Sequence, residues 1–396
     1  MTRAARAARA AARTGRAAGI ARAAAVAAAC VLSAASCGSA RPGGTSAPPA
    51  PGPSLATSVA TAAGTWAVMV LGGSAAAHHG FWQLLTRPAG TRAWRLVTPP
   101  GVASNGGLAV APAGGRSAEA GFLPSQGRSF SPLAATADGG SRWSPGVLGA
   151  GLARLPGALA AAPGTGRLLA LLAGGTAELS APGGARWARL ATLGSLARTA
   201  AGRRCGLTGL AAASFGPSNA PVLAGTCTHR ATAGVFTLSG GTWHLAGPAL
   251  PASLGAPVRI LAVTPAGGAA TAVLAAGTGR NVMLLAAWRH GARWALSPPL
   301  PLGGAQVRSV SAGPGGATGI TLNGRAAVTV AGPGASWQWL PFLPPGSQTL
   351  AFGPGARVAA LAAAGSTFTG WTWAPGSAAW AKVQTLHVPI QYGSSA

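Results

Sequence analysis

Few side chains in this sequence could carry acid–base chemistry. Its three acidic residues are Glu119, Asp138 and Glu178, and hydrolysis of a glycosidic bond needs two carboxylates within about 10 Å of each other. Glu119 and Glu178 lie in apolar runs of successive repeats, which does not favour their convergence, and Asp138 lies in a glycine-rich turn. We expect both glutamates to be solvated strand residues. The sequence therefore predicts no catalytic residue and a protein that is not an enzyme.

Metal-ligating and nucleophilic patterns are also missing from the sequence. His78 and His79 are adjacent in a Gly/Ala-rich loop, and neither an acid nor a Cys accompanies them as a further metal ligand. No Ser can be assigned the His and Asp partners of a catalytic triad. The single lysine, Lys382, does not follow a phosphate-binding loop. We therefore expect no metal site and no cofactor.

Two cysteines predict an oxidising compartment. Cys205 and Cys227 flank two apolar runs that are joined by a Gly-Pro-Ser-Asn turn at 216–219. If these runs form an antiparallel hairpin, the two cysteines face each other across it. The sequence therefore predicts a cross-strand disulfide between them. The other two cysteines, Cys30 and Cys37, lie in the N-terminal leader.

Residues 1–36 predict an export signal. Six arginines precede the apolar stretch Ala23–Ala35, which is too short to span a membrane as a helix. The run Ala34-Ala35-Ser36-Cys37 resembles a bacterial lipobox, in which the Cys becomes the lipidated first residue of the mature protein, although Ala stands where Leu is usual. Ordinary signal-peptidase cleavage near Ala35 is the alternative. Residues 37–54, rich in Pro, Gly and Ser, predict a flexible linker.

The chain is strongly basic, with 29 Lys+Arg against 3 Asp+Glu and a formal net charge of +26. Its content of Ala, Gly, Pro and Arg, together with its single lysine, is typical of a GC-rich, actinobacterial-type coding sequence. The positive charge therefore has two possible explanations: codon bias, or selection for binding an anionic partner. Net charge by itself is evidence about solubility and non-specific binding, and it does not identify a specific function.

A tryptophan that follows a Gly-containing turn recurs on average about every 48 residues. The stretch between two such markers holds four short apolar runs, for example 258–264, 270–276, 282–288 and 293–296, which predict four strands. Four-stranded antiparallel sheets repeated at a fixed period are typical of β-propeller blades. The marker residues are Trp94, Trp143, Trp187, Trp243, Trp294, Trp337 and Trp380.

One hairpin sequence resembles a known family. Thr136, Asp138, Gly140 and Trp143 stand at the positions of the Asp-box, the Ser/Thr-x-Asp-x-Gly-x-x-Trp hairpin of sialidase-like β-propellers. The resemblance implies that Asp138 ties down a turn on the outer strands of a blade. Together with the seven markers, it predicts an all-β, seven-bladed propeller of four-stranded antiparallel blades over residues 55–396.

The sequence pattern of the first repeat is one strand short. We expect the C-terminal segment His387–Tyr392 to complete the first blade, because closing the ring removes exposed sheet edges. The alternative is that Leu55–Ala60 supplies the missing strand.

The resemblance to sialidases implies, for an active enzyme, an arginine triad, a Tyr–Glu nucleophile pair and an Asp acid–base. The single tyrosine, Tyr392, lies in the C-terminal tail, and the hairpin turn already occupies Asp138. We therefore expect an exported, lipid-anchored, monomeric propeller that acts as a non-enzymatic binding or scaffolding module at the cell envelope. A divergent sialidase-like exo-glycosidase is the alternative. The expected partners are an envelope polymer, a glycan or a protein, and the membrane through the lipid anchor, but not nucleic acid.

Overall fold

The computed structural model describes residues 56–72, 81–99, 107–122, 132–144, 147–148, 156–182, 186–229, 231–266, 269–291, 293–332, 335–353 and 356–389. The predicted signal peptide, Cys37, the linker, His78–His79 and Tyr392 lie outside these residues. The chain from Pro51 to Ala396 forms one compact unit. Within the described part of the chain, no helix is long and apolar enough to cross a membrane.

Groups of four successive strands pair antiparallel, and each group is called a sheet below. Two further pairings, β1 with β22 and β14 with β17, join groups to one another, so the described strands form five hydrogen-bonded sheets. The first three sheets are β1 (Thr57–Thr61), β2 (Gly64–Leu71), β3 (Phe81–Pro88), β4 (Arg95–Leu96); β5 (Leu108–Gly114), β6 (Ser117–Phe122), β7 (Pro132–Thr136), β8 (Val147–Leu148); and β9 (Pro156–Ala162), β10 (Arg167–Leu172), β11 (Thr176–Ser180), β12 (Trp187–Thr192).

The next two sheets are β13 (Leu207–Phe215), β14 (Pro221–Cys227), β15 (Gly234–Ser239), β16 (Thr242–Leu245); and β17 (Val258–Ala266), β18 (Ala269–Ala276), β19 (Met283–His290), β20 (Arg293–Leu296), with the short β21 (Leu300–Pro301) beside β19. The last two are β22 (Ser309–Ala312), β23 (Thr318–Thr321), β24 (Ala326–Thr329), β25 (Gln338–Trp339); and β26 (Ser347–Phe352), β27 (Val358–Ala364), β28 (Thr367–Trp373), β29 (Ala381–His387). The helices α1 (Leu193–Ala197) and α2 (Ala200–Cys205) interrupt this order between β12 and β13.

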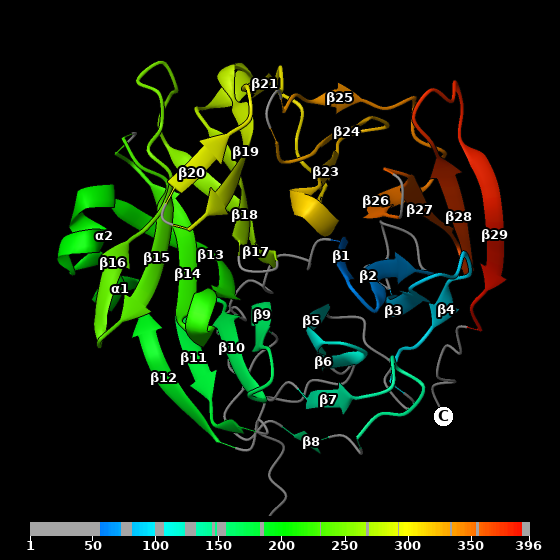
Figure 1. Cartoon of the computed structure of the whole chain (residues 1–396), viewed down its shortest axis with the longest axis horizontal. Helices are drawn as coiled ribbons and strands as arrows, with labels where there is room; N and C mark the ends of the chain where they lie inside the picture. Colours follow the sequence, from blue (N-terminus) through cyan, green and yellow to red (C-terminus); the bar gives the residue numbers. More distant parts are fainter. Residues whose placement is uncertain are drawn as a thin grey trace, which may run out of the picture. The chain divides into compact units, whose positions relative to one another are not determined.

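The sheets close into a ring. The first strand of each sheet contacts the first strand of the next, from β1 through β5, β9, β13, β17 and β22 to β26, and β26 contacts β1 again. Figure 1 shows β1, β5, β9, β17 and β26 toward the middle of this unit, and β8, β12, β16, β25 and β29 at its rim. A closed ring of radially arranged antiparallel sheets is a β-propeller. The predicted propeller fold is confirmed.

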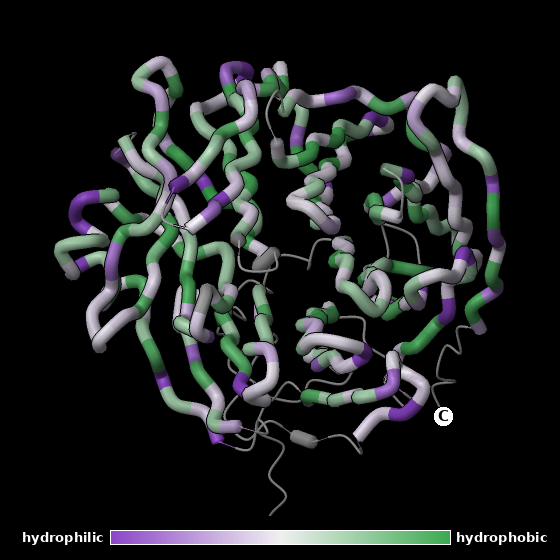
Figure 2. Tube along the Cα trace, viewed as in Figure 1, coloured by the Kyte–Doolittle hydropathy of each residue, from purple (hydrophilic) through white to green (hydrophobic). Residues whose placement is uncertain are grey.

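The marker tryptophans lie at the junctions between sheets. Each of the seven belongs to a different apolar cluster, and each cluster combines residues of two adjacent sheets. Figure 2 shows hydrophobic residues spread along the strands of this unit. Four of the indole N–H groups also donate hydrogen bonds to the preceding sheet. Each acceptor lies a few residues after the marker tryptophan of that preceding sheet. These hydrogen bonds are Trp143 to Val97 O (2.9 Å), Trp294 to Ala246 O (2.8 Å), Trp337 to Ser297 Oγ (3.1 Å) and Trp380 to Pro341 O (3.3 Å).

The expected closure of the ring is wrong. The strand β1, on the N-terminal side, pairs with β2 and completes the first sheet, as the alternative held. His387 instead ends β29, which pairs with β28 in the last sheet. The reason is local: a tight turn joins β1 to β2, and closing a short loop costs less conformational entropy than recruiting a strand from the far end of the chain.

The disulfide is present, but its geometry differs from the prediction. Cys205 and Cys227 are bonded, yet Cys205 is the last residue of α2 and not part of β13. Gly206 ends the helix in the left-handed conformation, with φ 66°, which suits a residue without a Cβ. The bridge therefore joins a helix end to the end of β14. The sequence pattern did not show the α1–α2 insertion because its two helices have five and six residues, too few for a helical period.

Candidate functional site

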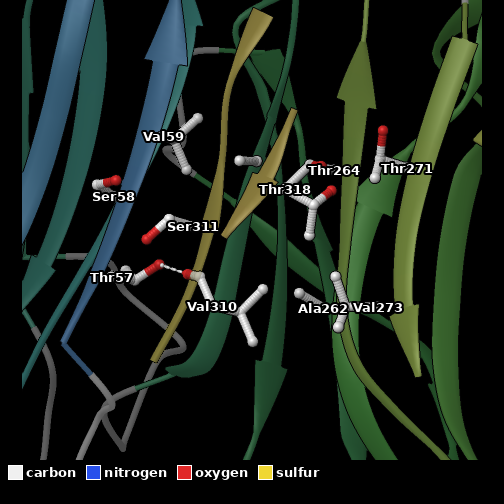
Figure 3. Close-up of a pocket in the computed structure, with 11 residues that line it drawn as sticks. Thr57, Ser58, Val59, Ala262, Thr264, Thr271, Val273, Val310, Ser311 and Thr318 are labelled. Atoms are coloured by element: carbon white, nitrogen blue, oxygen red, sulfur yellow. Dashed lines mark hydrogen bonds between the residues drawn. The ribbon is translucent and has the colours of Figure 1, made fainter. Parts of the chain in front are cut away.

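A cavity of about 40 Å³ lies between β1, β17, β18, β22 and β23 (Figure 3). A void of this size holds a few water molecules, whereas small-molecule pockets span about 300–1,000 Å³. No residue that lines it is ionisable. The hydroxyl side chains in its lining are those of Thr57, Ser58, Thr264, Thr271, Ser311 and Thr318.

Hydroxyl groups beside this cavity bind the inner strands together. Ser58 of β1 and Ser311 of β22 are buried, and both donate to the carbonyl oxygen of Leu350 on β26. In addition, β1 and β22 form a short parallel pair. Because these hydroxyls already have protein partners, we assign them to the structure of the ring and not to a ligand.

The two glutamates are not the solvated side chains that the sequence predicted. Glu119 on β6 is half-buried, and burial raises its pKa to about 7. Its neighbours Ala118 and Ala120 pack toward the first sheet, so strand alternation points Glu119 toward the third. Glu178 on β11 alternates with Ala177, which packs toward the fourth sheet, so it points back toward the second.

Both carboxylates therefore face the layer between the second and third sheets. Burial raises the pKa of Glu178, and the nearby charge of Arg189 partly opposes this. The Oε2 atom of Glu178 is buried and has no hydrogen-bond partner among the described residues. Neither carboxylate lines the 40 Å³ cavity or the cavity of about 10 Å³ beside Arg95 and Arg116.

We expect Glu119→Gln to make stability less dependent on pH. The folded-state pKa of about 7 lies above the ordinary value of 4.5, so the folded state holds the extra proton and stability falls as pH rises through this window. The variant should be more stable than the parent by about 1–2 kcal/mol at about pH 8, once solvent screening is allowed for, and equally stable at about pH 4. Urea denaturation at both pH values measures this. If the variant and the parent differed in stability by the same amount at both pH values, the expectation would be contradicted.

The residues that resemble an Asp-box in sequence form a hydrogen-bonded turn after β7. Asp138 Oδ1 accepts from the Arg142 N–H (2.9 Å) and from the Thr136 hydroxyl (3.0 Å), while Thr136 Oγ1 accepts from the Gly140 N–H (3.0 Å). These bonds, led by that of Arg142, hold the pKa of Asp138 below its ordinary value. A Cβ on Gly140 would lie 2.6 Å from the Cβ of Val97, so the turn packs directly against the first sheet.

An aromatic–arginine patch occupies the outer edge of the β22–β25 sheet. The Arg325 guanidinium lies 4.1 Å from the ring centroid of Trp339, which is cation–π geometry. Trp339 is 37% exposed and Phe342, just beyond β25, is 80% exposed. From the sequence, Trp339 lies outside the seven marker positions and is predicted to pack within a blade and not to stack on a sugar. Arg325 and Phe342 have no predicted role.

The described residues contain no group of three or more His, Cys, Asp or Glu side chains placed to hold a metal ion. No protein-family model matches the chain, and no curated protein matches it.

Similarity to solved structures is present at low sequence identity. A protein from Lactobacillus plantarum aligns at 11% identity over 82% of this chain and 97% of its own, with a TM-score of 0.53. A putative 6-phosphogluconolactonase from Bacteroides uniformis aligns at 12% identity over 81% and 96%, with a TM-score of 0.50. A GH74 xyloglucanase from Xanthomonas campestris aligns at 14% identity over 81% and 52%, also at 0.50. These similarities concern the fold alone.

Proposed function

We propose that this protein is an exported, lipid-anchored propeller of seven four-stranded blades that acts as a non-enzymatic binding or scaffolding module at the cell envelope. The seven-blade assignment is supported by the grouping of the described strands into seven successive antiparallel fours and by one marker tryptophan at each junction. Export is supported by the disulfide between Cys205 and Cys227, since such bonds persist in oxidising compartments. In this proposal residues 1–36 are the signal peptide, Cys37 carries the lipid, and 37–54 tether the ring.

The aromatic–arginine patch of Arg325, Trp339 and Phe342 is the observation that carries the proposal. Phe342, 80% exposed and three residues beyond the Trp339 that stacks with Arg325, costs hydration free energy in the free protein, and these three residue types are enriched where proteins bind partners. The cavity of about 40 Å³ between the inner strands is too small for a ligand of ordinary size. Binding through the outer surface therefore fits the molecule better than binding in its middle.

Asp138 has a structural role in this proposal. Both bonds to its Oδ1 atom come from its own turn, at Thr136 and Arg142, and Trp143 fixes the hairpin to the first sheet. A carboxylate held in this way stays ionised and is a poor proton donor.

A sialidase-like exo-glycosidase is the second candidate, and one observation favours it. A pKa of about 7 suits Glu119 to general acid catalysis. However, Glu119 faces an inter-sheet layer and not a cavity, and a glycosidic bond must reach its acid catalyst. We therefore prefer the binding module.

We expect Trp339→Ala combined with Phe342→Ser to abolish binding to an envelope polymer. The measurement is co-sedimentation of the protein with purified cell-wall polysaccharide, because the flat faces of aromatic rings stack on sugar rings. The control is Leu96→Ser with Val383→Ser, which removes two other exposed apolar side chains, 39% and 44% exposed, from other edges. Equal loss in both variants, or unchanged binding in the patch variant, would refute the assignment of this patch.

A further inference from the structure

The α1–α2 insertion carries a compact group of cations. Arg198, Arg203 and Arg204 are all exposed, and the imidazole of His229 lies beside them, with its Nδ1 3.0 Å from the carbonyl oxygen of Arg204. The insertion contacts the outer strands of two sheets, β12 through α1 and β16 through α2. Figure 1 shows it at the rim of the unit.

No carboxylate balances this charge within the described residues. Glu119 lies on β6 and Asp138 in the hairpin after β7, both in another sheet. Glu178 is half-buried on β11 and points toward the second sheet, away from the insertion. Like charges held together without a counter-charge repel one another, and an anionic ligand would relieve this repulsion.

Several other arginines have protein partners for their guanidinium groups. Arg116 donates to the Asp138 carbonyl, Arg308 donates to Asn323, and Arg325 stacks on Trp339. Within the insertion, Arg203 donates to the carbonyl oxygen of Arg198, and no hydrogen bond joins the guanidinium groups of Arg198 and Arg204 to a described residue. Codon bias explains a high arginine count, but it does not explain why three exposed arginines gather between positions 198 and 204.

The insertion is also rigid. Thr192 and Ser195 form a capping box at the start of α1, with bonds of 3.0 and 2.8 Å, and Thr199 caps α2. Leu196 is fully buried beneath α1, and the disulfide at Cys205 fixes the end of α2 to β14. Side chains presented from a fixed backbone lose less entropy on binding than side chains on a flexible loop.

We propose that this insertion binds a linear polymer that carries a phosphate on each repeat. Arginine forks bind phosphate oxygens in pairs, and a chain of phosphates can reach several guanidinium groups at once. A single anion would find no enclosure, since neither described cavity lies at the insertion. No large apolar side chain of residues 193–206 is exposed, which favours a polymer over insertion into a lipid bilayer. The inference needs only the folded ring and holds whether or not Cys37 is lipidated.

The test measures binding of labelled long-chain inorganic polyphosphate to the full chain at about 50 and about 200 mM salt. The variant Arg198→Gln/Arg203→Gln/Arg204→Gln should bind on the order of tenfold more weakly and show a shallower salt dependence, since fewer counterions are released. The corresponding triple Arg→Lys variant keeps the charge and should retain most of the affinity. The matched control Arg92→Gln/Arg186→Gln/Arg293→Gln removes the same charge from three separate exposed sites and should bind nearly as well as the parent.

Several results would overturn the proposal. Equal losses in the clustered and scattered variants would mean that net charge alone drives binding. Inorganic phosphate that competes as well as polyphosphate, at equal phosphate concentration, would mean a single-anion site. Vesicles of phosphatidylglycerol that bind through the same three arginines, in preference to polyphosphate, would make the partner a membrane. If the triple Gln variant has a lower melting temperature, its weaker binding has a second explanation. The triple Lys variant and the scattered control then decide whether the three clustered arginines bind polyphosphate.

Discussion

Trp94→Ala is expected to lower the free energy of unfolding by about 3–5 kcal/mol, the range for deleting a buried Trp side chain. The Trp94 side chain is 2% exposed, and its cluster joins the first sheet to the last. Its ring makes an edge contact with Phe368 of β28, with the centroids 6.3 Å apart. The guanidinium of Arg87 lies 5.1 Å from the ring centroid. Removal of the indole therefore leaves a cavity at the junction where the chain closes its ring.

Two glutamine side chains also join the first and last sheets at this junction, through backbone groups that Trp94→Ala leaves in place. Gln384 of β29 accepts from the Trp94 N–H (2.6 Å) and donates to its carbonyl oxygen (2.9 Å). Gln348 makes the same pair of bonds to the backbone of Val70 (2.9 and 2.6 Å). Each side-chain amide pairs with the N–H and the C=O of one residue, as a backbone peptide group of a neighbouring strand would. The first and last sheets, which share no strand, are therefore still joined by hydrogen bonds of this kind.

Urea denaturation of the parent, Trp94→Ala and Trp339→Ala measures the effect. Trp339 is 37% exposed at a sheet edge, so its truncation should cost less than about 1 kcal/mol. Trp94→Phe, which keeps an aromatic ring at the junction, should fall between the two. If Trp94→Ala were no less stable than Trp339→Ala, the first and last sheets would not depend on this side chain for closure.

The spacing of the tryptophans predicted the propeller well, for a physical reason. Each sheet must bury one face against the preceding sheet, and a Trp at the start of the fourth strand fills that space once in every sheet. The tryptophans therefore recur in the sequence because a junction between two sheets recurs in the fold. The turn at Asn323-Gly324 was readable in part. The sequence predicts a type I′ hairpin there, which requires a positive φ at both residues. The turn does join β23 to β24, but only Gly324 has a positive φ (67°), so the turn is present and its predicted type is wrong.

Features that depend on distant parts of the chain were not readable in the same way. The contact between the first and last sheets includes side chains such as Gln348, which bonds to the backbone of Val70 and whose sequence context gave no sign of this role. The burial of Glu119 depends on the neighbouring sheet, which its own strand sequence does not encode. Phe342 has an ordinary apolar sequence context, and only the structure shows it to be exposed.

Loss of the disulfide is the other large effect that we expect. Cys205 and Cys227 are fully buried, and their Cα atoms lie 5.2 Å apart across a sequence separation of 22. The chain-entropy model gives about 3 kcal/mol for a closed loop of this length, because the bond limits the unfolded chain. Gly234 packs against the bridge: a Cβ there would lie 2.5 Å from the Cys227 sulfur and 3.3 Å from that of Cys205.

The double variant Cys205→Ser/Cys227→Ser should therefore be less stable than the parent by about 3 kcal/mol in urea denaturation. The buried hydroxyls add to this cost unless they find partners. Reductant supplies the control, since it should destabilise the parent toward the variant and leave the variant unchanged. Hydrogen exchange should rise first in α2, because its end is fixed to β14 by this bond, while the Trp94 junction on the far side of the ring should keep its protection. A parent that is insensitive to reductant, or a variant as stable as the parent, would show that the apolar cluster around Leu196 and Phe236 holds the insertion without the bond.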